Sequence, residues 1–312
     1  MDLELNADQR ALHEAIINIV SRHQELPRIG PTVKPVTYYE GEALSRELEA
    51  GEFFSIALTE GFGALEAGLL VFEAARSPQV VETAGSALIA PLLTGEALPR
   101  PIAVARSEDL TRAVRFLDRA KTLIIDLGDD VAVLSTEQLQ VRPVHSMFAY
   151  PLGRLEAAPD LTRARRVGAG GVAKLSRLWR LALAFEMAGA MQAAIDFTTD
   201  YVKSRKVFAR PVGSYQAVQH RLATDVQKAR GAYWLALKAA WSGRELDAAA
   251  AALYAQEAVG HVIYDTHQFN GALGMTLEHA LHFWTFRLRI LEGELGGATA
   301  QGRAVATLAW PA

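Results

Sequence analysis

The chain has 312 residues, half of them hydrophobic, and a formal net charge of -3. Such a balanced charge argues against a nucleic-acid-binding surface and against a polybasic membrane anchor. The absence of cysteine excludes disulfides, thiolate-ligated metals and cysteine nucleophiles.

The first part of the chain, residues 1–98, is expected to form a helical domain. Asn6, followed by Gln9 three residues later, is typical of a capping box, in which both side chains satisfy backbone amides at a helix start. Apolar residues recur at helical spacing after it. Further helices are predicted over residues 41–51 and 66–75.

The middle part, residues 99–160, changes to a strand-like pattern. Two β-rich runs, 122–126 and 131–134, flank the turn 127–130, where Gly and Asp tolerate a positive φ. A third run, 139–144, alternates apolar and polar residues. We expect a reduced β domain with a small sheet.

The last part, residues 161–312, is helical again. A long helix is predicted after Gly171, with apolar residues at helical spacing over 175–195, and a second helix shows the same spacing over 222–240. A third is predicted over about 246–266, and a fourth follows Thr276, which can cap it. Four residues of the fourth helix are expected to face inward: Leu281, Trp284, Leu288 and Leu291. Four amphipathic helices with short connections predict a four-helix bundle.

A basic and aromatic loop lies between the first two bundle helices. Arg205 can grip a pyrophosphate with two parallel hydrogen bonds, and Phe208, three residues on, can stack on a purine. The alternative is a solvated basic helix end whose cations complement the helix dipole.

A second cluster runs from Gln268 through Gly271 to Gly274. Glycines beside a helix end let the backbone approach a phosphate. The alternative is ordinary punctuation between two helices. No strand precedes the cluster, so it is not the dinucleotide fingerprint of a Rossmann fold.

Together the two clusters resemble the acyl-CoA dehydrogenase family. That family carries a run Arg-x-x-Phe-Gly-x-Pro-[Ile/Val]-x-x-[Phe/Tyr]-Gln, matched here by Arg205, Phe208, Pro211, Val212, Tyr215 and Gln216, with Ala209 in place of Gly. It also carries Gln-x-x-Gly-Gly-x-Gly, matched by Gln268, Gly271 and Gly274, with Ala272 in place of the second Gly. The order of helices, sheet and helices is also similar to that of the family.

The resemblance implies FAD as cofactor and a set of contacts to its adenosine–pyrophosphate half. Those residues would be Arg205, Phe208, Gln216, Gln268, Gly271 and Ala272. In the family such contacts reach across a dimer interface to a flavin held mainly by the neighbouring subunit, and the bundle is the oligomerisation surface.

The catalytic base that this family needs is not evident. The chemistry requires a carboxylate to remove the α-proton of an acyl-CoA while a hydride leaves the β-carbon. Glu292 and Glu294 are the candidates after the last bundle helix, and polar residues at a helix end are the alternative reading. The position that aligns with a second family site is Trp179, and Glu186 is expected to be a buried structural or interface carboxylate.

The histidines do not predict a metal site. His279 and His282 follow Glu278 in the order Glu-His-x-x-His, which is not the zinc-protease order, and no third ligand accompanies them.

Three functions follow from these observations. The first is a subunit of a heterotetrameric FAD-dependent acyl-CoA dehydrogenase, in which a longer partner supplies the flavin-ring pocket, the acyl-CoA site and the base. The resemblance leads us to expect such paired, unequal subunits, as in similar proteins of bacterial sterol side-chain degradation. The second is a complete homo-oligomeric dehydrogenase that uses Glu292 or Glu294, and the third is a helical assembly protein without flavin.

We expect neither a leader nor a membrane span. The longest apolar stretch, residues 181–197, contains Glu186, Gln192 and Asp196 and is shorter than the roughly 20 residues that a span needs. The N-terminus lacks the positive region of a signal peptide. A cytoplasmic location is therefore predicted.

Overall fold

The computed structural model describes residues 4–27, 29 and 36–310. The α-helices are α1 (Ala7–Ser21), α2 (Glu42–Ala50), α3 (Ala64–Arg76), α4 (Ala90–Thr94), α5 (Gly171–Ser204), α6 (Gln216–Ser242), α7 (Glu245–Gly274), α8 (His282–Gly293) and α9 (Gly297–Ala309). The strands are β1 (Tyr39–Glu40), β2 (Gln79–Val80), β3 (Ile102–Arg106), β4 (Val114–Arg115), β5 (Thr122–Asp126), β6 (Val131–Ser135), β7 (Val141–Pro143), β8 (Leu152–Leu155), β9 (Arg165–Arg166), β10 (Lys206–Val207) and β11 (Arg210–Pro211). The predicted mainly helical fold, with a reduced middle β region and a C-terminal bundle, is confirmed.

The N-terminal helices form as their local sequence indicates. The capping box at the start of α1 is present, because the Asn6 side chain accepts from the Gln9 amide at 2.8 Å and the Gln9 side chain accepts from the Asn6 amide at 3.0 Å. Gln9 also donates to Glu66 at the start of α3. Every residue from Glu66 to Ala75 is buried, since α3 is sandwiched between α1 and the bundle.

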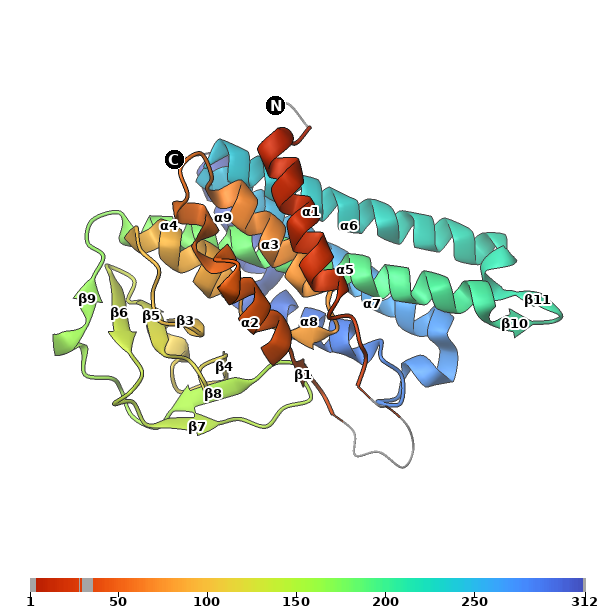
Figure 1. Ribbon diagram of the computed structural model, residues 1–312, viewed down its shortest axis with the longest axis horizontal. Helices are drawn as coiled ribbons and strands as arrows, with labels where there is room; N and C mark the ends of the chain where they lie inside the picture. Colours follow the sequence, from red (N-terminus) through yellow and green to blue (C-terminus); the bar gives the residue numbers. More distant parts are fainter. Residues whose placement is uncertain (1–3, 28, 30–35, 311–312) are drawn as a thin grey trace.

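The middle strands form two small sheets rather than the one expected. In the first, β5 and β6 make the predicted hairpin, turning at Gly128 with a φ of 90°. This sheet has the order β3-β5-β6-β9, and the second has the order β4-β8-β7. The second sheet was missed because β4 and β8 are short and lack an alternating pattern. Both sheets lie at one end of the molecule (Figure 1).

Three long helices, α5, α6 and α7, and the shorter α8 build the C-terminal bundle. Helices α5, α6 and α7 run antiparallel in sequence order, and α8 packs against α5 and α7 (Figure 1). The four residues expected to face inward on α8 or at its start are buried: Leu281, Trp284, Leu288 and Leu291. The chain then breaks at Leu295, Gly296 and Gly297, which all have positive φ, and a further helix, α9, returns along α7. The sequence did not predict α9.

The N-terminal helices and the bundle share one hydrophobic core. Helix α3 approaches α5 closely at Gly189, where an added Cβ would lie 2.2 Å from the carbonyl oxygen of Phe72. The β10–β11 hairpin projects from the end of the bundle opposite the two sheets (Figure 1). The molecule therefore has a sheet-covered end and a hairpin end.

Candidate functional site

The hairpin end of the bundle brings together the two sequence clusters. Arg205 ends α5, Phe208 is at the hairpin tip and Gln216 begins α6. Because α7 runs antiparallel to α6, its final turn, with Gln268 and Gly271, lies at the same end (Figure 1). All six residues predicted to contact a cofactor are exposed.

The hairpin holds Phe208 away from the protein. Phe208 and Ala209 have φ values of 50° and 66°, so the two-residue turn is left-handed at both positions. The hydroxyl of Tyr215 donates to the carbonyl of Val207 at 3.1 Å, and the Arg210 guanidinium stacks 3.9 Å from the Tyr215 ring. The Phe208 side chain is 90% exposed. An aromatic ring presented in this way is free to meet a ligand or another chain.

The end of α7 opens a pocket beside Gln268. Gly271 leaves the helical conformation with a φ of 62° and a ψ of -147°, and no atom lies within 4 Å of the place of a Cβ there. The pocket has a volume of about 620 Å³, within the range of small-molecule sites. Its lining includes Tyr264, His267, Gln268, Gly271, Ala272 and Arg289.

Contacts among the three helices fix this end of the bundle. Arg221 of α6 pairs with both carboxylate oxygens of Asp265 on α7, and its guanidinium lies 4.9 Å from the Phe269 ring. Asn270 of α7 donates to Thr198 of α5 at 2.8 Å. The spacing between the start of α6 and the end of α7 is therefore set by paired side chains.

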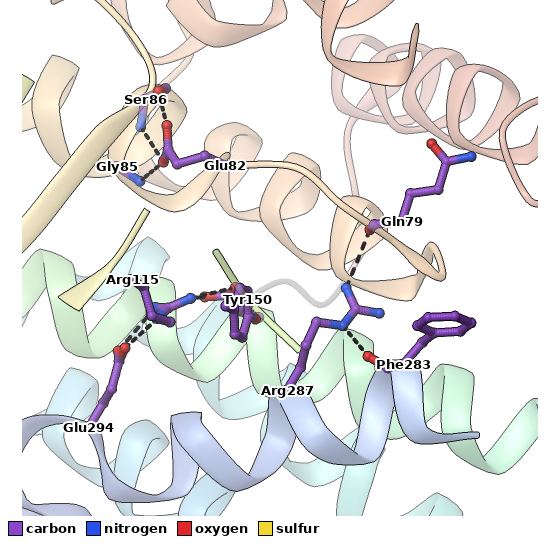
Figure 2. Close-up of polar contacts among 10 residues, drawn as sticks. Gln79, Glu82, Gly85, Ser86, Arg115, Tyr150, Phe283, Arg287 and Glu294 are labelled. Carbon is purple, nitrogen blue, oxygen red and sulfur yellow. Dashed lines mark hydrogen bonds and ion pairs between the residues drawn. The ribbon is translucent and has the colours of Figure 1, made fainter. Parts of the chain in front are cut away.

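The opposite side of the bundle, under β4, holds a buried polar cluster. Arg115 donates to Glu186 of α5 at 2.9 Å and 3.1 Å, and to both carboxylate oxygens of Glu294. The Tyr150 hydroxyl donates to Glu186 at 2.6 Å. Figure 2 shows Arg115 pointing toward Glu294 and Tyr150. We refer to Arg115, Tyr150, Glu186 and Glu294 as the Arg115 cluster.

Burial and neighbouring charges shift the pKa values of two residues in the Arg115 cluster. Burial, supported by the Glu186 carboxylate, raises the pKa of Tyr150 well above its ordinary value. Burial opposes the charge of Arg115, but Glu186 and Glu294 outweigh it and raise the pKa of Arg115 well above its ordinary value. The hydroxyl therefore stays protonated and the guanidinium charged. The cluster is a closed ion-pair network.

A second buried arginine lies beside the cluster. Arg287 of α8 donates to the backbone carbonyls of Phe283 and Ser77, each at 2.6 Å (Figure 2 shows the Phe283 contact). Burial lowers the pKa of Arg287, and Tyr150 and Glu186 oppose this effect. With Arg115 and the two carboxylates, the region contains two cations and two anions.

Very little space remains at the Arg115 cluster. The cavity that Arg115 and Glu294 line, together with Trp179 and Phe116, has a volume of about 30 Å³. This is far below the ~300–1,000 Å³ of small-molecule sites.

The two candidate bases lie in different surroundings. Glu294 belongs to the buried Arg115 cluster, whereas Glu292 lies in the last turn of α8 and accepts from Arg289 at 3.0 Å at the surface. Glu186 is buried, as a structural carboxylate would be. His282 directs both ring nitrogens at backbone carbonyls, of His279 and Val36.

The bundle itself carries the family relationship. Residues 174–306 match the family model described as acyl-CoA dehydrogenase, C-terminal domain. The chain is similar to acyl-CoA dehydrogenases, and residues 174–306 carry their C-terminal domain. The resemblance predicted from the sequence is therefore confirmed, since the matched domain and the relatives below are those of acyl-CoA dehydrogenases.

Two relatives illustrate the extent of the match. The acyl-CoA dehydrogenase FadE27 of Mycobacterium tuberculosis is 33% identical over 172 residues, which cover 49% of this chain and 45% of FadE27. The acyl-CoA dehydrogenase IpdE2 of the same organism is 25% identical over 293 residues, which cover 89% of each chain. The chain thus spans less than half of the first relative and most of the second.

Solved structures share the fold along the whole chain. A chain of the ChsE4–ChsE5 complex from Mycobacterium tuberculosis has a TM-score of 0.80 at 21% identity, with 100% of both chains covered. A chain from a variant of the Tcur3481–Tcur3483 steroid ACAD has a TM-score of 0.76 at 22% identity, with 98% of both chains covered. The acyl-CoA dehydrogenase fold is therefore present from the N-terminal helices to the bundle.

Sequence reasoning missed most of the Arg115 cluster. Glu186 was expected to be buried, but its partner Arg115 is 71 residues away and lies in a two-residue strand with no recognisable pattern. Arg115 and Glu294 are 179 residues apart.

In the described part of the chain, no helix has both the length and the apolar character of a membrane span.

Proposed function

We propose that this chain is the non-catalytic subunit of a heteromeric, FAD-dependent acyl-CoA dehydrogenase. It grips the adenosine–pyrophosphate half of an FAD that a longer partner subunit holds, and that partner supplies the acyl-CoA site and the base. The observation that carries the proposal is the contrast between an open, basic hairpin end and a filled Arg115 cluster.

The hairpin end fits the adenosine half of a dinucleotide. Arg205 is exposed, and no ion pair in the described residues engages it, so its fork is free for a pyrophosphate. Phe208 offers a free aromatic face, and Gly271 leaves an open approach to the backbone. Gln216 begins α6 at this end of the bundle, and Gln268 and Ala272 line the pocket at the end of α7. When bound, FAD would supply the hydride acceptor of the reaction.

The Arg115 cluster supports a non-catalytic role. A base for α-proton removal needs access to substrate, whereas both oxygens of Glu294 accept hydrogen bonds from Arg115. The adjoining cavity of about 30 Å³ is too small for a flavin ring or a thioester. In this chain the space between the sheets and the bundle serves stability rather than chemistry.

The substrate class follows from the relatives. A protein of the same fold is a steroid ACAD, and another is a two-component complex, ChsE4–ChsE5. We therefore assign to the heteromer a substrate in which the side chain of a steroid forms the acyl-CoA thioester. The assembly would contain two short and two longer subunits.

Co-expression with a longer acyl-CoA dehydrogenase subunit tests the proposal. The complex should be yellow and active, and the lone chain should lack turnover. Arg205→Ala or Phe208→Ala in this chain should weaken FAD binding by about 10- to 100-fold, the effect of losing a charge-assisted hydrogen bond or a stacked ring.

The matched control is Arg303→Ala. Arg303 is exposed on α9, and this helix contacts Arg180 near the start of α5, far from the hairpin. The Arg303→Ala variant should leave FAD binding unchanged. Full flavin loading and turnover from the lone chain would refute the proposal.

The complete homo-oligomeric dehydrogenase makes a different prediction. Its base would be Glu292, which is partly exposed, or Glu294 after rearrangement of the Arg115 cluster. Glu292→Gln and Glu294→Gln would then abolish turnover of the lone chain with an artificial electron acceptor. The absence of flavin from every preparation would instead favour a helical assembly protein.

A further inference from the structure

One buried carboxyl group at the hairpin end lacks a partner. Asp225 of α6 is 1% exposed, and its Oδ2 is buried without a hydrogen-bond donor. The buried Glu82 differs, since it accepts from the amides of Gly85, Ser86 and Ile102. An ionised carboxylate without donors is costly to bury. The fold therefore favours neutral Asp225.

Asp225 lies one helical turn from Arg221. Residues four apart share a helix face, so Arg221 is the natural ion-pair partner of Asp225. Arg221 is instead committed to Asp265 of α7. One guanidinium thus lies between two carboxyl groups, only one of which it engages.

Few charges act on Asp225. Burial raises its pKa to about 7, the Asp265 carboxylate adds to the rise, and Arg221 and Lys228 oppose it. Among the residues described, no charged group of α5 or α3, the other α-helices packed on α6, contributes to this shift. Both protonation states are therefore accessible near neutral pH.

Arg221 connects this acid to the proposed cofactor contacts. Its guanidinium lies 4.9 Å from the Phe269 ring and 5.5 Å from the Tyr264 ring. Phe269 follows Gln268 directly, and Tyr264 lines the same pocket as Gln268. A change in the partner of Arg221 would therefore shift the end of α7 relative to α6.

We propose that Asp225 is a proton-dependent latch of the FAD-binding end. While Asp225 is neutral, Arg221 stays with Asp265 and the ends of α6 and α7 keep their spacing. Ionised Asp225 competes for Arg221 and adds a negative charge near the site that receives the pyrophosphate. FAD binding is then coupled to proton uptake by Asp225. The inference rests on the proposed function and adds a pH control to it.

The latch predicts a pH-dependent FAD affinity in the two-subunit complex. The dissociation constant for FAD, measured by flavin fluorescence, should increase about tenfold from pH 6 to pH 8, as expected when one proton must be taken up. Asp225→Asn, which has the shape of the neutral acid, should bind FAD equally across this range. Asp200→Asn, an exposed acid near the end of α5, should keep the wild-type profile.

Unfolding of the lone chain at several pH values tests the raised pKa of Asp225 directly. Because the folded-state pKa of Asp225 is raised, its favourable contribution to stability is present below the unfolded-state pKa and is lost as the pH rises toward 7. Asp225→Asn should therefore gain stability relative to wild type over this range, with a constant difference above it.

The outcomes separate the latch from the proposed function. If Asp225→Asn retains the wild-type pH profile for FAD while Arg205→Ala still weakens binding, the latch is wrong and the proposed function stands. If Arg205→Ala has no effect on FAD, the proposed function fails and the latch fails with it, whatever the unfolding data show.

Discussion

Arg115 is the residue that pairs the buried charges between the sheets and the bundle, and the stability of this interior depends on it. It engages two carboxylates from distant segments, Glu186 and Glu294. Removing it leaves Glu186 with only the Tyr150 hydroxyl as a donor and removes the cation that pairs with the partly buried Glu294. Removal of one partner from a buried ion pair costs far more than the pair contributes relative to an apolar replacement.

Arg115→Met should therefore lower the free energy of unfolding by about 3–5 kcal/mol. The loss should shrink in acid, where the unpaired carboxylates can take up protons. Denaturant unfolding at several pH values measures both effects. Arg112→Met is the control, because Arg112 is 76% exposed and pairs only with Asp109 among the described residues; its effect should stay within about 0.5 kcal/mol. A loss below about 1 kcal/mol for Arg115→Met would show that the Arg115 cluster contributes little to stability.

At the scale of elements, the contact between α3 and α5 joins the N-terminal helices to the bundle. Gly189 permits this approach, since the backbone of α3 lies where its Cβ would be. Gly68 of α3 makes a similar contact with Phe185 of α5, where an added Cβ would lie 2.2 Å from the ring. Small residues on both helices thus set the interaxial distance.

Gly189→Ala should destabilise the protein by about 1–3 kcal/mol, because the two helices must move apart. Gly302→Ala in α9 is the matched change, since its Cβ would meet only Leu253 at 3.9 Å. It should be neutral or stabilising by up to about 1 kcal/mol through helix propensity. Thermal unfolding of both variants measures these changes in stability. Equal effects of the two substitutions would show that the close approach of α3 and α5 at Gly189 is unimportant.

At the scale of the whole molecule, α6 presents two exposed tryptophans on the outer face of the bundle. Trp234 and Trp241 lie two turns apart on α6 and are 41% and 62% exposed. Exposed aromatic side chains on a shared helix face are typical of protein interfaces. The bundle was predicted from the sequence to be the oligomerisation surface, and this face is its strongest candidate.

Trp234→Glu combined with Trp241→Glu should reduce the assembly to smaller species without unfolding the chain. Analytical ultracentrifugation of the co-expressed complex measures the first effect, and thermal unfolding of the lone chain measures the second. Gln227→Glu adds a charge to the same helix face and should leave the assembly intact. Unchanged mass of the double variant would place the subunit interface elsewhere.

The amino-acid sequence alone was sufficient for the features that depend on neighbouring residues. The capping box of Asn6 and Gln9, the hairpin turn at Gly128 and the inward face of α8 are local patterns, and the family motifs from Arg205 to Gln216 are contiguous. Only the tertiary structure decided which distant side chains meet. The Arg115 cluster joins residues 71 and 179 positions apart, and the isolation of Asp225 depends on Arg221 having paired with another helix. Such contacts depend on how whole helices pack, and short-range periodicity carries no information about that.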